Sequence, residues 1–197
     1  RDHGLRIDGA ALSGASRVLK DLLPLINAET SLDSLRGLEG AGASAYFQVL
    51  DHMILNDKET FSFQGRTRRP PLDPFNALLS FSYSLLANDC ASALESVGLD
   101  SYVGFLHRDR PGRTSLALDL MEELRPCLAD RFVLTLVNNR VVNAGSFQYR
   151  EGGAVLMRDD ARRIFLRAWQ ERKPKTITHP YLGEKLPWGL VPYIQAL

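Results

Sequence analysis

Residues 106–123 read LHRDRPGRTSLALDLMEE and join a histidine, several arginines and a carboxylate-rich segment in one short stretch. The pattern predicts a helix over 115–125, with Thr114 or Ser115 at its start and Pro126 at its end. Leucines and a methionine repeat at helical spacing on one face of this segment. We therefore expect the helix to pack its apolar face against a core and to present its other face to a site or to solvent.

That other face carries three carboxylates, Asp119, Glu122 and Glu123. Side chains three and four residues apart are neighbours on a helix, so three like charges repel one another there. A solvated acidic face is one interpretation, and a bound cation is the other. With His107, these residues offer oxygen donors and one imidazole, a set that suits Mn²⁺ or Mg²⁺ better than structural zinc.

A second helix is predicted over residues 31–53, SLDSLRGLEGAGASAYFQVLDHM, with Thr30 and Asp33 as its start signal. At about 100° per residue, Glu39 falls in the middle of the apolar stripe of this helix. A buried carboxylate requires a cation opposite it, either an arginine or a metal ion. Three glycines near Glu39 weaken the helix, and close approach of another helix or of a substrate would explain them.

Two arginine-rich loops accompany these acids. One lies between His107 and the acidic helix, and the other is the segment GRTRRPP. Guanidinium groups match the geometry of phosphate oxygens, so these loops are candidates for holding a nucleic-acid backbone, although each could also be a solvated loop. The arginines selected as DNA-binding residues are Arg66, Arg68, Arg69, Arg110 and Arg113.

The order of three segments resembles a known family. LRGLEGAGASAYF (35–47), GRTRRPPLDPFNALLSFSYSLL (65–86) and GLDSYVGFLHRDRPGRTSLALDLMEELRP (98–126) are similar to motifs of the integrase and endonuclease of CRISPR adaptation, the first-numbered Cas protein. The resemblance runs from about residue 31 to the end of the chain. It also covers Asp73, Asn76 and Tyr83, which match a D-P-x-N…Y helix of the family.

The resemblance implies that Glu39, His107 and Glu122 are ligands of one Mn²⁺ or Mg²⁺ ion and that Asp119 supports the site. Glu123 follows closely enough to be an alternative to Glu122. The implied activity is metal-dependent cleavage and joining of DNA, in which a 3′-hydroxyl of a short DNA attacks a phosphodiester of a CRISPR repeat. The family also implies a homodimer and a second-numbered Cas protein as partners. A non-catalytic DNA-holding scaffold and a metal-dependent nucleotide phosphohydrolase remain as alternative hypotheses.

Length and composition bound the remaining expectations. The chain has 197 residues, of which 45% are hydrophobic and 24% charged, with a net charge of +1, so we expect one globular domain whose DNA contacts come from local patches. Two cysteines, Cys90 and Cys127, are too few for a disulfide framework and fit a reducing cytoplasm. No apolar run reaches the roughly 18 residues that a membrane span needs.

The predicted fold is mostly α, a multi-helix catalytic domain with one small β hairpin. The hairpin is SFQY, a turn at 150–153 and AVLM. Further helices are predicted near 12–27, kinked or broken near Pro24, and near 74–96 and 158–171, with a last helix at the end; 56–73 and 173–188 are predicted loops. The family's N-terminal β-rich domain has no counterpart in this sequence, so we expect a catalytic domain truncated at both ends.

Overall fold

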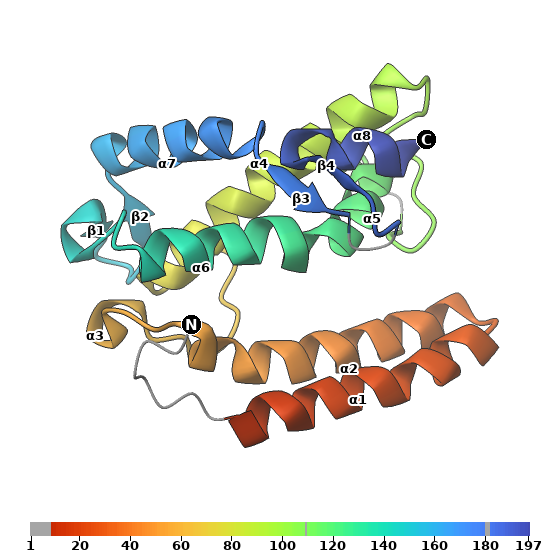
Figure 1. Cartoon of the computed structure of the whole chain (residues 1–197), viewed down its shortest axis with the longest axis horizontal. Coiled ribbons are helices and arrows are strands. Elements are labelled where there is room, and N and C mark those ends of the chain that lie inside the picture. Colours follow the sequence, from red (N-terminus) through yellow and green to blue (C-terminus); the bar gives the residue numbers. More distant parts are fainter. Residues whose placement is uncertain (1–8, 109, 180–181) are drawn as a thin grey trace.

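The computed structural model describes residues 9–108, 110–179 and 182–197, and it confirms a mostly helical fold (Figure 1). The helices are α1 (Gly9–Ala28), α2 (Leu32–Leu50), α3 (Lys58–Phe61), α4 (Pro74–Ser96), α5 (Ser115–Leu124), α6 (Arg131–Asn138), α7 (Asp159–Arg172) and α8 (Val191–Ala196). Shorter helical turns join several of them: η1 (Asp51–Met53), η2 (Arg125–Asp130), η3 (Ala144–Ser146) and η4 (Trp188–Leu190). The two small sheets are β1 (Phe147–Tyr149) with β2 (Val155–Met157), and β3 (Thr176–Thr178) with β4 (Lys185–Pro187).

Helices α1 and α2 form a helical hairpin along one side of the molecule (Figure 1). The helix α1 passes through Pro24 without a break, and none of its residues is buried. In α2 only Leu50 is buried. The predicted capping pair of Thr30 and Asp33 is wrong, because the Ser31 side chain accepts the N–H of Ser34 and caps the helix.

Helix α4 runs through the centre of the main body (Figure 1). Its start was predicted correctly: Asp73 Oδ1 accepts the backbone N–H of Asn76 at 2.7 Å, and Pro74 occupies the first turn, where its missing N–H has no consequence. Many of its side chains are fully buried, including Phe75, Leu78 and Leu86. This helix is therefore the element against which the site helices are held.

Aromatic side chains from distant segments close the core on the α7 side. The ring of Phe132 on α6 meets Phe165 and Trp169 of α7 edge-to-face, with centroids 5.2 and 5.1 Å away. Trp169 also meets Trp188 at 4.7 Å. Aromatic pairs prefer such edge-to-face contacts, which add to the stabilisation that burial alone provides. They fix the C-terminal segment onto the helices.

The sequence predicted that the helix would end at Pro126, but the helical path continues past this proline. Helix α5 continues into η2, one stretch of π-helix that contains Pro126, and then into α6. Proline lacks an N–H and clashes with a normal helical turn, whereas the wider π turn tolerates it. Because the path continues, Arg125 and Asp130 are placed on one short turn next to α5.

The predicted hairpin is confirmed, and a second hairpin lies in the segment that was predicted as a loop. Strands β1 and β2 are antiparallel, with Gln148 opposite Leu156. Strands β3 and β4 are also antiparallel, with Ile177 opposite Leu186. Prolines at 174, 180 and 187 hid this hairpin from sequence analysis, because proline usually excludes a central strand position. Pro180 and Tyr181 lie outside the described residues.

Among the described residues, no helix combines the length and the apolar character needed to cross a membrane. Helix α4 is 23 residues long, but serines at 80, 82 and 84 interrupt its apolar sequence. Its buried residues contact the core of the domain. The hydrophobic side chains of this helix are therefore accounted for by packing within the protein.

Candidate metal and DNA site

The loop that carries His107 is organised by one carboxylate, Asp119 of α5. Asp119 Oδ2 accepts the backbone N–H groups of Phe105 and Leu106 at 2.6 and 3.1 Å. Asp119 Oδ1 accepts the N–H of His107 at 2.9 Å and lies 2.7 Å from its Nδ1. Both oxygens of a single side chain thus fix the loop and the imidazole together.

This bonding pattern sets the properties of both residues. Burial raises the pKa of Asp119, but the hydrogen bonds from His107 and from the loop amides outweigh it, and the pKa lies below its ordinary value. An ionised carboxylate at Nδ1 assigns the ring proton to that nitrogen and leaves Nε2 with its lone pair. The carboxylate–histidine pair is the arrangement that orients metal-binding histidines in proteins.

Glu122 lies one helical turn after Asp119 and is held by Arg125. The two side chains form a fork: Arg125 Nη1 donates to Glu122 Oε1 at 2.9 Å, and Arg125 Nη2 lies 2.7 Å from Glu122 Oε2. Burial raises the pKa of Glu122, and the negative charge of Glu39 raises it further, while Arg125 and His107 act in the opposite direction. The carboxylate therefore lies within electrostatic reach of both other predicted ligands.

Glu39 does not occupy the buried position that the helical pattern predicted. Glu39 is exposed, because α2 is covered by α1 on one side and contacts the main body at only a few points. Arg36 Nε donates to Leu106 O at 2.7 Å, and the Tyr46 hydroxyl donates to Asp130 Oδ2 at 3.0 Å. Residues 36, 39 and 46 follow helical spacing along one face, so Glu39 lies between two anchors on the side that faces α5.

The glycines around Glu39 have two different surroundings. The space beside Gly37 and Gly40 is open, whereas Gly42 lies against the side chains of Leu19 and Leu22 of α1. Close packing of a helix thus accounts for Gly42 alone. Gly37 faces the hollow between α1 and α2 rather than Glu39, so no neighbouring side chain explains Gly37 or Gly40.

Glu123 points to a different part of the structure. It is exposed, and its Oε2 accepts a hydrogen bond from Gln195 Nε2 of α8 at 2.8 Å. Glu122, in contrast, interacts electrostatically with both Glu39 and His107. The geometry favours Glu122 over Glu123 as the third member of the site.

The three predicted ligands are neighbours, but they do not surround one point. Within the part of the chain that the structure describes, no three histidine, cysteine or acidic side chains are grouped closely enough to hold a metal ion. Arg125 occupies both oxygens of Glu122, and Glu39 is exposed. The donor types themselves fit a hard dication, since the three residues are two carboxylates and one imidazole.

The predicted DNA-binding arginines fall into two groups. Arg66 is half-buried, and its guanidinium donates to Asn76 Oδ1 at 2.7 Å and to Ser80 Oγ at 3.0 Å, so its contacts are within the protein. The others lie at or near the surface; Arg68, Arg69 and Arg110 are exposed and Arg113 is partly exposed. Arg68 also lowers the pKa of Glu122, which places its charge near the site.

A buried polar cluster behind Glu122 was missed by the sequence analysis. Asp130 is fully buried and accepts the hydroxyls of Tyr83 at 2.6 Å and Tyr46 at 3.0 Å. The guanidinium carbons of Arg66 and Arg125 lie 5.1 and 5.2 Å from the centre of the Tyr83 ring. Burial raises the pKa of Asp130, and the tyrosine hydrogen bonds lower it in part. An acid inside the apolar sequence 128–137 was the available signal for this cluster.

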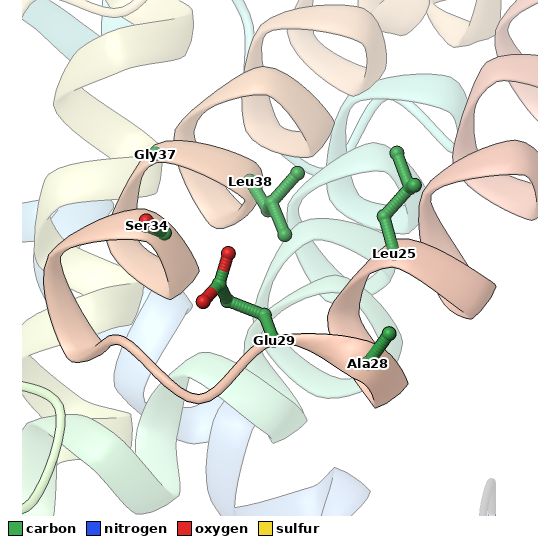
Figure 2. Close-up of a pocket in the computed structure, with 6 residues that line it drawn as sticks. All are labelled: Leu25, Ala28, Glu29, Ser34, Gly37 and Leu38. Atoms are coloured by element: carbon green, nitrogen blue, oxygen red, sulfur yellow. The ribbon is translucent and has the colours of Figure 1, made fainter.

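Two hollows on the surface lie apart from these residues. One is between the end of α1 and the start of α2 (Figure 2), where its lining residues are Leu25, Ala28, Glu29, Ser34, Gly37 and Leu38. Glu29 Oε1 in this hollow accepts the backbone N–H groups of Thr30 and Ser31, so it stabilises the turn. The other runs along α6 beside Asn138, which is bonded to the segment 53–55. None of Glu39, His107, Asp119 or Glu122 lines either one.

Comparison with known proteins gives one consistent result. The family described as CRISPR associated protein Cas1 matches residues 1–171. A CRISPR-associated endonuclease Cas1 from Rhodospirillum rubrum is 56% identical over 200 residues, an alignment that covers all of this chain and 58% of that protein. The chain therefore spans somewhat more than half the length of this curated relative.

Solved structures agree with the sequence comparison. A casposase bound to integration product superposes with a TM-score of 0.74 at 26% identity, covering 94% of this chain and 56% of that one. A partial Cas6-RT-Cas1–Cas2 complex superposes with a TM-score of 0.76 at 30% identity, covering 95% of this chain and 54% of that one. Both superpositions cover more than nine-tenths of this chain and little more than half of the other.

Proposed function

Because the chain belongs to the Cas1 family of CRISPR-associated proteins, we propose that it is the catalytic part of a metal-dependent DNA endonuclease and integrase. The proposed reaction inserts short DNA fragments into a CRISPR array by transesterification. The observation that carries the proposal is the contact between Asp119 and His107. The charges of His107 and Glu39 both act on the pKa of the Glu122 carboxylate. These residues would supply the carboxylate and imidazole donors of the proposed dication from three segments of the chain.

The proposed ligands are Glu39, His107 through Nε2, and Glu122, with Mn²⁺ or Mg²⁺ as the ion. A bound dication would neutralise the charge that develops on the attacked phosphate and would lower the pKa of the attacking hydroxyl. Asp119 keeps the imidazole in the orientation and tautomer that ligation requires. Glu39 is exposed, so its carboxylate is accessible to an ion from solvent.

DNA would be held by the arginines at the rim. Arg68, Arg69 and Arg110 are exposed and Arg113 is partly exposed, so their guanidinium groups are able to contact phosphate oxygens. In the proposed reaction the 3′-hydroxyl of the incoming DNA attacks a phosphorus atom of the repeat, and the bridging 3′-oxygen of the cut strand leaves.

The proposed partners, DNA and a Cas2 protein, are suggested by the similar structures. One similar structure is a complex that contains Cas2, and another is a casposase bound to integration product. We propose that the complete protein acts in the cytoplasm on DNA duplexes with free 3′ ends, as a homodimer together with a Cas2 protein. The net charge of +1 agrees with a protein that holds DNA through local patches.

A non-catalytic scaffold is the second candidate, and one observation favours it. Arg125 neutralises Glu122 without any metal ion, so the acidic cluster is stable as a purely structural feature. Titration with Mn²⁺ separates the two functions. Heat of binding and a rise in Tm support the enzyme, and the absence of both supports the scaffold.

The test of the proposed function uses two substitutions at the site and one outside it. Glu39→Gln and His107→Ala are expected to abolish Mn²⁺-dependent DNA cleavage and joining while the helical circular dichroism signal stays unchanged. Glu59→Gln, an exposed acid on α3, is the matched control and should keep full activity. Full activity of purified Glu39→Gln or His107→Ala protein would refute the assignment.

A further inference from the structure

Arg125 and Glu122 form the most complete ion pair near the candidate site. Both carboxylate oxygens are engaged by the two terminal nitrogens of the guanidinium, at 2.9 and 2.7 Å. Their side chains are only 12% and 19% exposed, so solvent screens the pair little. A dication cannot use Glu122 as a ligand until this fork opens on at least one side.

Arg125 is held in place by more than its carboxylate partner. Its guanidinium carbon lies 5.2 Å from the centre of the Tyr83 ring and 5.9 Å from that of Phe47 on α2. The Tyr83 hydroxyl is itself anchored on buried Asp130 at 2.6 Å. Cations are stabilised over aromatic rings, so the guanidinium keeps its position when the Glu122 carboxylate rotates away.

Opening the fork leaves guanidinium donors facing the site without a partner. Unpaired donors in a largely buried position are unfavourable, and a second positive charge beside a dication adds repulsion. A phosphate group removes both problems, because its oxygens match the fork and its charge offsets the repulsion. The positive charges of Arg66 and Arg68 are already close to this cluster and attract the same group.

We propose that Arg125 is a positioning residue that exchanges the Glu122 carboxylate for a phosphate oxygen of the DNA when a dication takes Glu122. The inference rests on the proposed function, since it presupposes both a metal ion and DNA at this site. Its consequence is thermodynamic coupling: DNA strengthens metal binding and metal strengthens DNA binding by the same factor. Without DNA, the Arg125 fork keeps the affinity for the dication low.

The coupling is measured on the full 197-residue chain as the Kd of Mn²⁺, with and without a short DNA duplex. Free Mn²⁺ is followed by its electron paramagnetic resonance signal, and binding of Mn²⁺ to the duplex alone is subtracted. For the unmodified protein we expect DNA to lower the Kd at least about tenfold. Arg125→Gln is expected to bind Mn²⁺ more tightly than the unmodified protein in the absence of DNA, and DNA should then change its Kd less than twofold.

Two further variants make the result specific. Arg163→Gln removes the same charge from the exposed face of α7 and should behave like the unmodified protein. Arg125→Lys retains a cation over Tyr83 and Phe47 but cannot form the fork, so it should fold even if Arg125→Gln does not, and it should lose most of the DNA effect.

Two outcomes overturn the inference without touching the proposed function. One is Mn²⁺ binding that is indifferent to DNA in the unmodified protein. The other is a DNA effect of unchanged size in either Arg125 variant. Failure of the unmodified protein to bind Mn²⁺ under any condition is a distinct result, and it counts against the proposed function as well.

Discussion

Asp119 Oδ1 lies 2.7 Å from His107 Nδ1, although the two residues are separated by a loop that contains Pro111 and Gly112. The same carboxylate accepts three consecutive backbone N–H groups, from residues 105 to 107. One side chain therefore determines both the path of the loop and the direction of the imidazole.

Asp119→Asn is expected to weaken both folding and activity. An amide cannot accept all four hydrogen bonds, so exposed and partly buried donors of the loop lose a charged acceptor and the free energy of unfolding falls by about 1–3 kcal/mol. Mn²⁺-dependent activity should fall about 10–100-fold, because the imidazole is no longer held in place. Urea unfolding and DNA cleavage assays measure the two effects. Unaltered activity of the folded variant would contradict the positioning role of Asp119.

Glu122→Gln and Glu123→Gln form a matched pair that distinguishes two adjacent acids. Glu122 is near Glu39 and His107, whereas Glu123 contacts Gln195 at the surface. We expect Glu122→Gln to lower Mn²⁺-dependent cleavage at least about 100-fold. Glu123→Gln should leave both activity and stability close to those of the unmodified protein, within about 0.5 kcal/mol. The reverse pattern would reassign the third ligand to Glu123.

Asn76→Ala is expected to release the arginine-rich loop from α4. The Asn76 amide is fully buried and bonds Arg66, the N–H of Thr67 and the carbonyl of Gly65. Its removal leaves several buried groups unpaired, so the free energy of unfolding should fall by about 2–3 kcal/mol. Asn88→Ala, an exposed position on the same helix, is the control and should have little effect. Chemical denaturation of the two variants provides the comparison.

The pH dependence of stability should have opposite signs at Asp51 and Asp130. Burial raises the pKa of Asp51, but hydrogen bonds from Lys58 and from the N–H of Phe63 bring it below 3.8, so its contribution is present above that pH and is lost as pH falls through the folded pKa. Burial raises the pKa of Asp130, so its contribution is present below 3.8 and is lost as pH rises through the folded pKa.

The two aspartates are compared through their asparagine variants. The stability difference between unmodified protein and Asp51→Asn should grow as pH rises from about 2 to 4. The corresponding difference for Asp130→Asn should shrink as pH rises above about 4. Urea unfolding at a series of pH values gives both slopes. Parallel slopes would show that the burial of Asp130 does not favour its protonated form.

Local signals in the sequence were enough to locate the main elements. The Asp73–Pro74 cap and the apolar spacing of 74–96 predicted α4 with its observed ends, and the hairpin at 147–157 was predicted from its alternation and its glycine turn. These features depend on backbone capping and on side-chain periodicity within a few residues. The identities of His107, Asp119 and Glu122 as candidate site residues were likewise available from their chemistry and spacing.

The surroundings of those residues were decided by the tertiary structure. Glu39 has the periodicity of a core position but is exposed, although α2 contacts the body through Arg36 and Tyr46 on either side of it. The helical path that continues past Pro126 places Asp130 against Tyr83 of α4 and Tyr46 of α2. Such contacts join segments far apart in sequence, and a helical or strand period contains no information about which distant side chain will lie opposite.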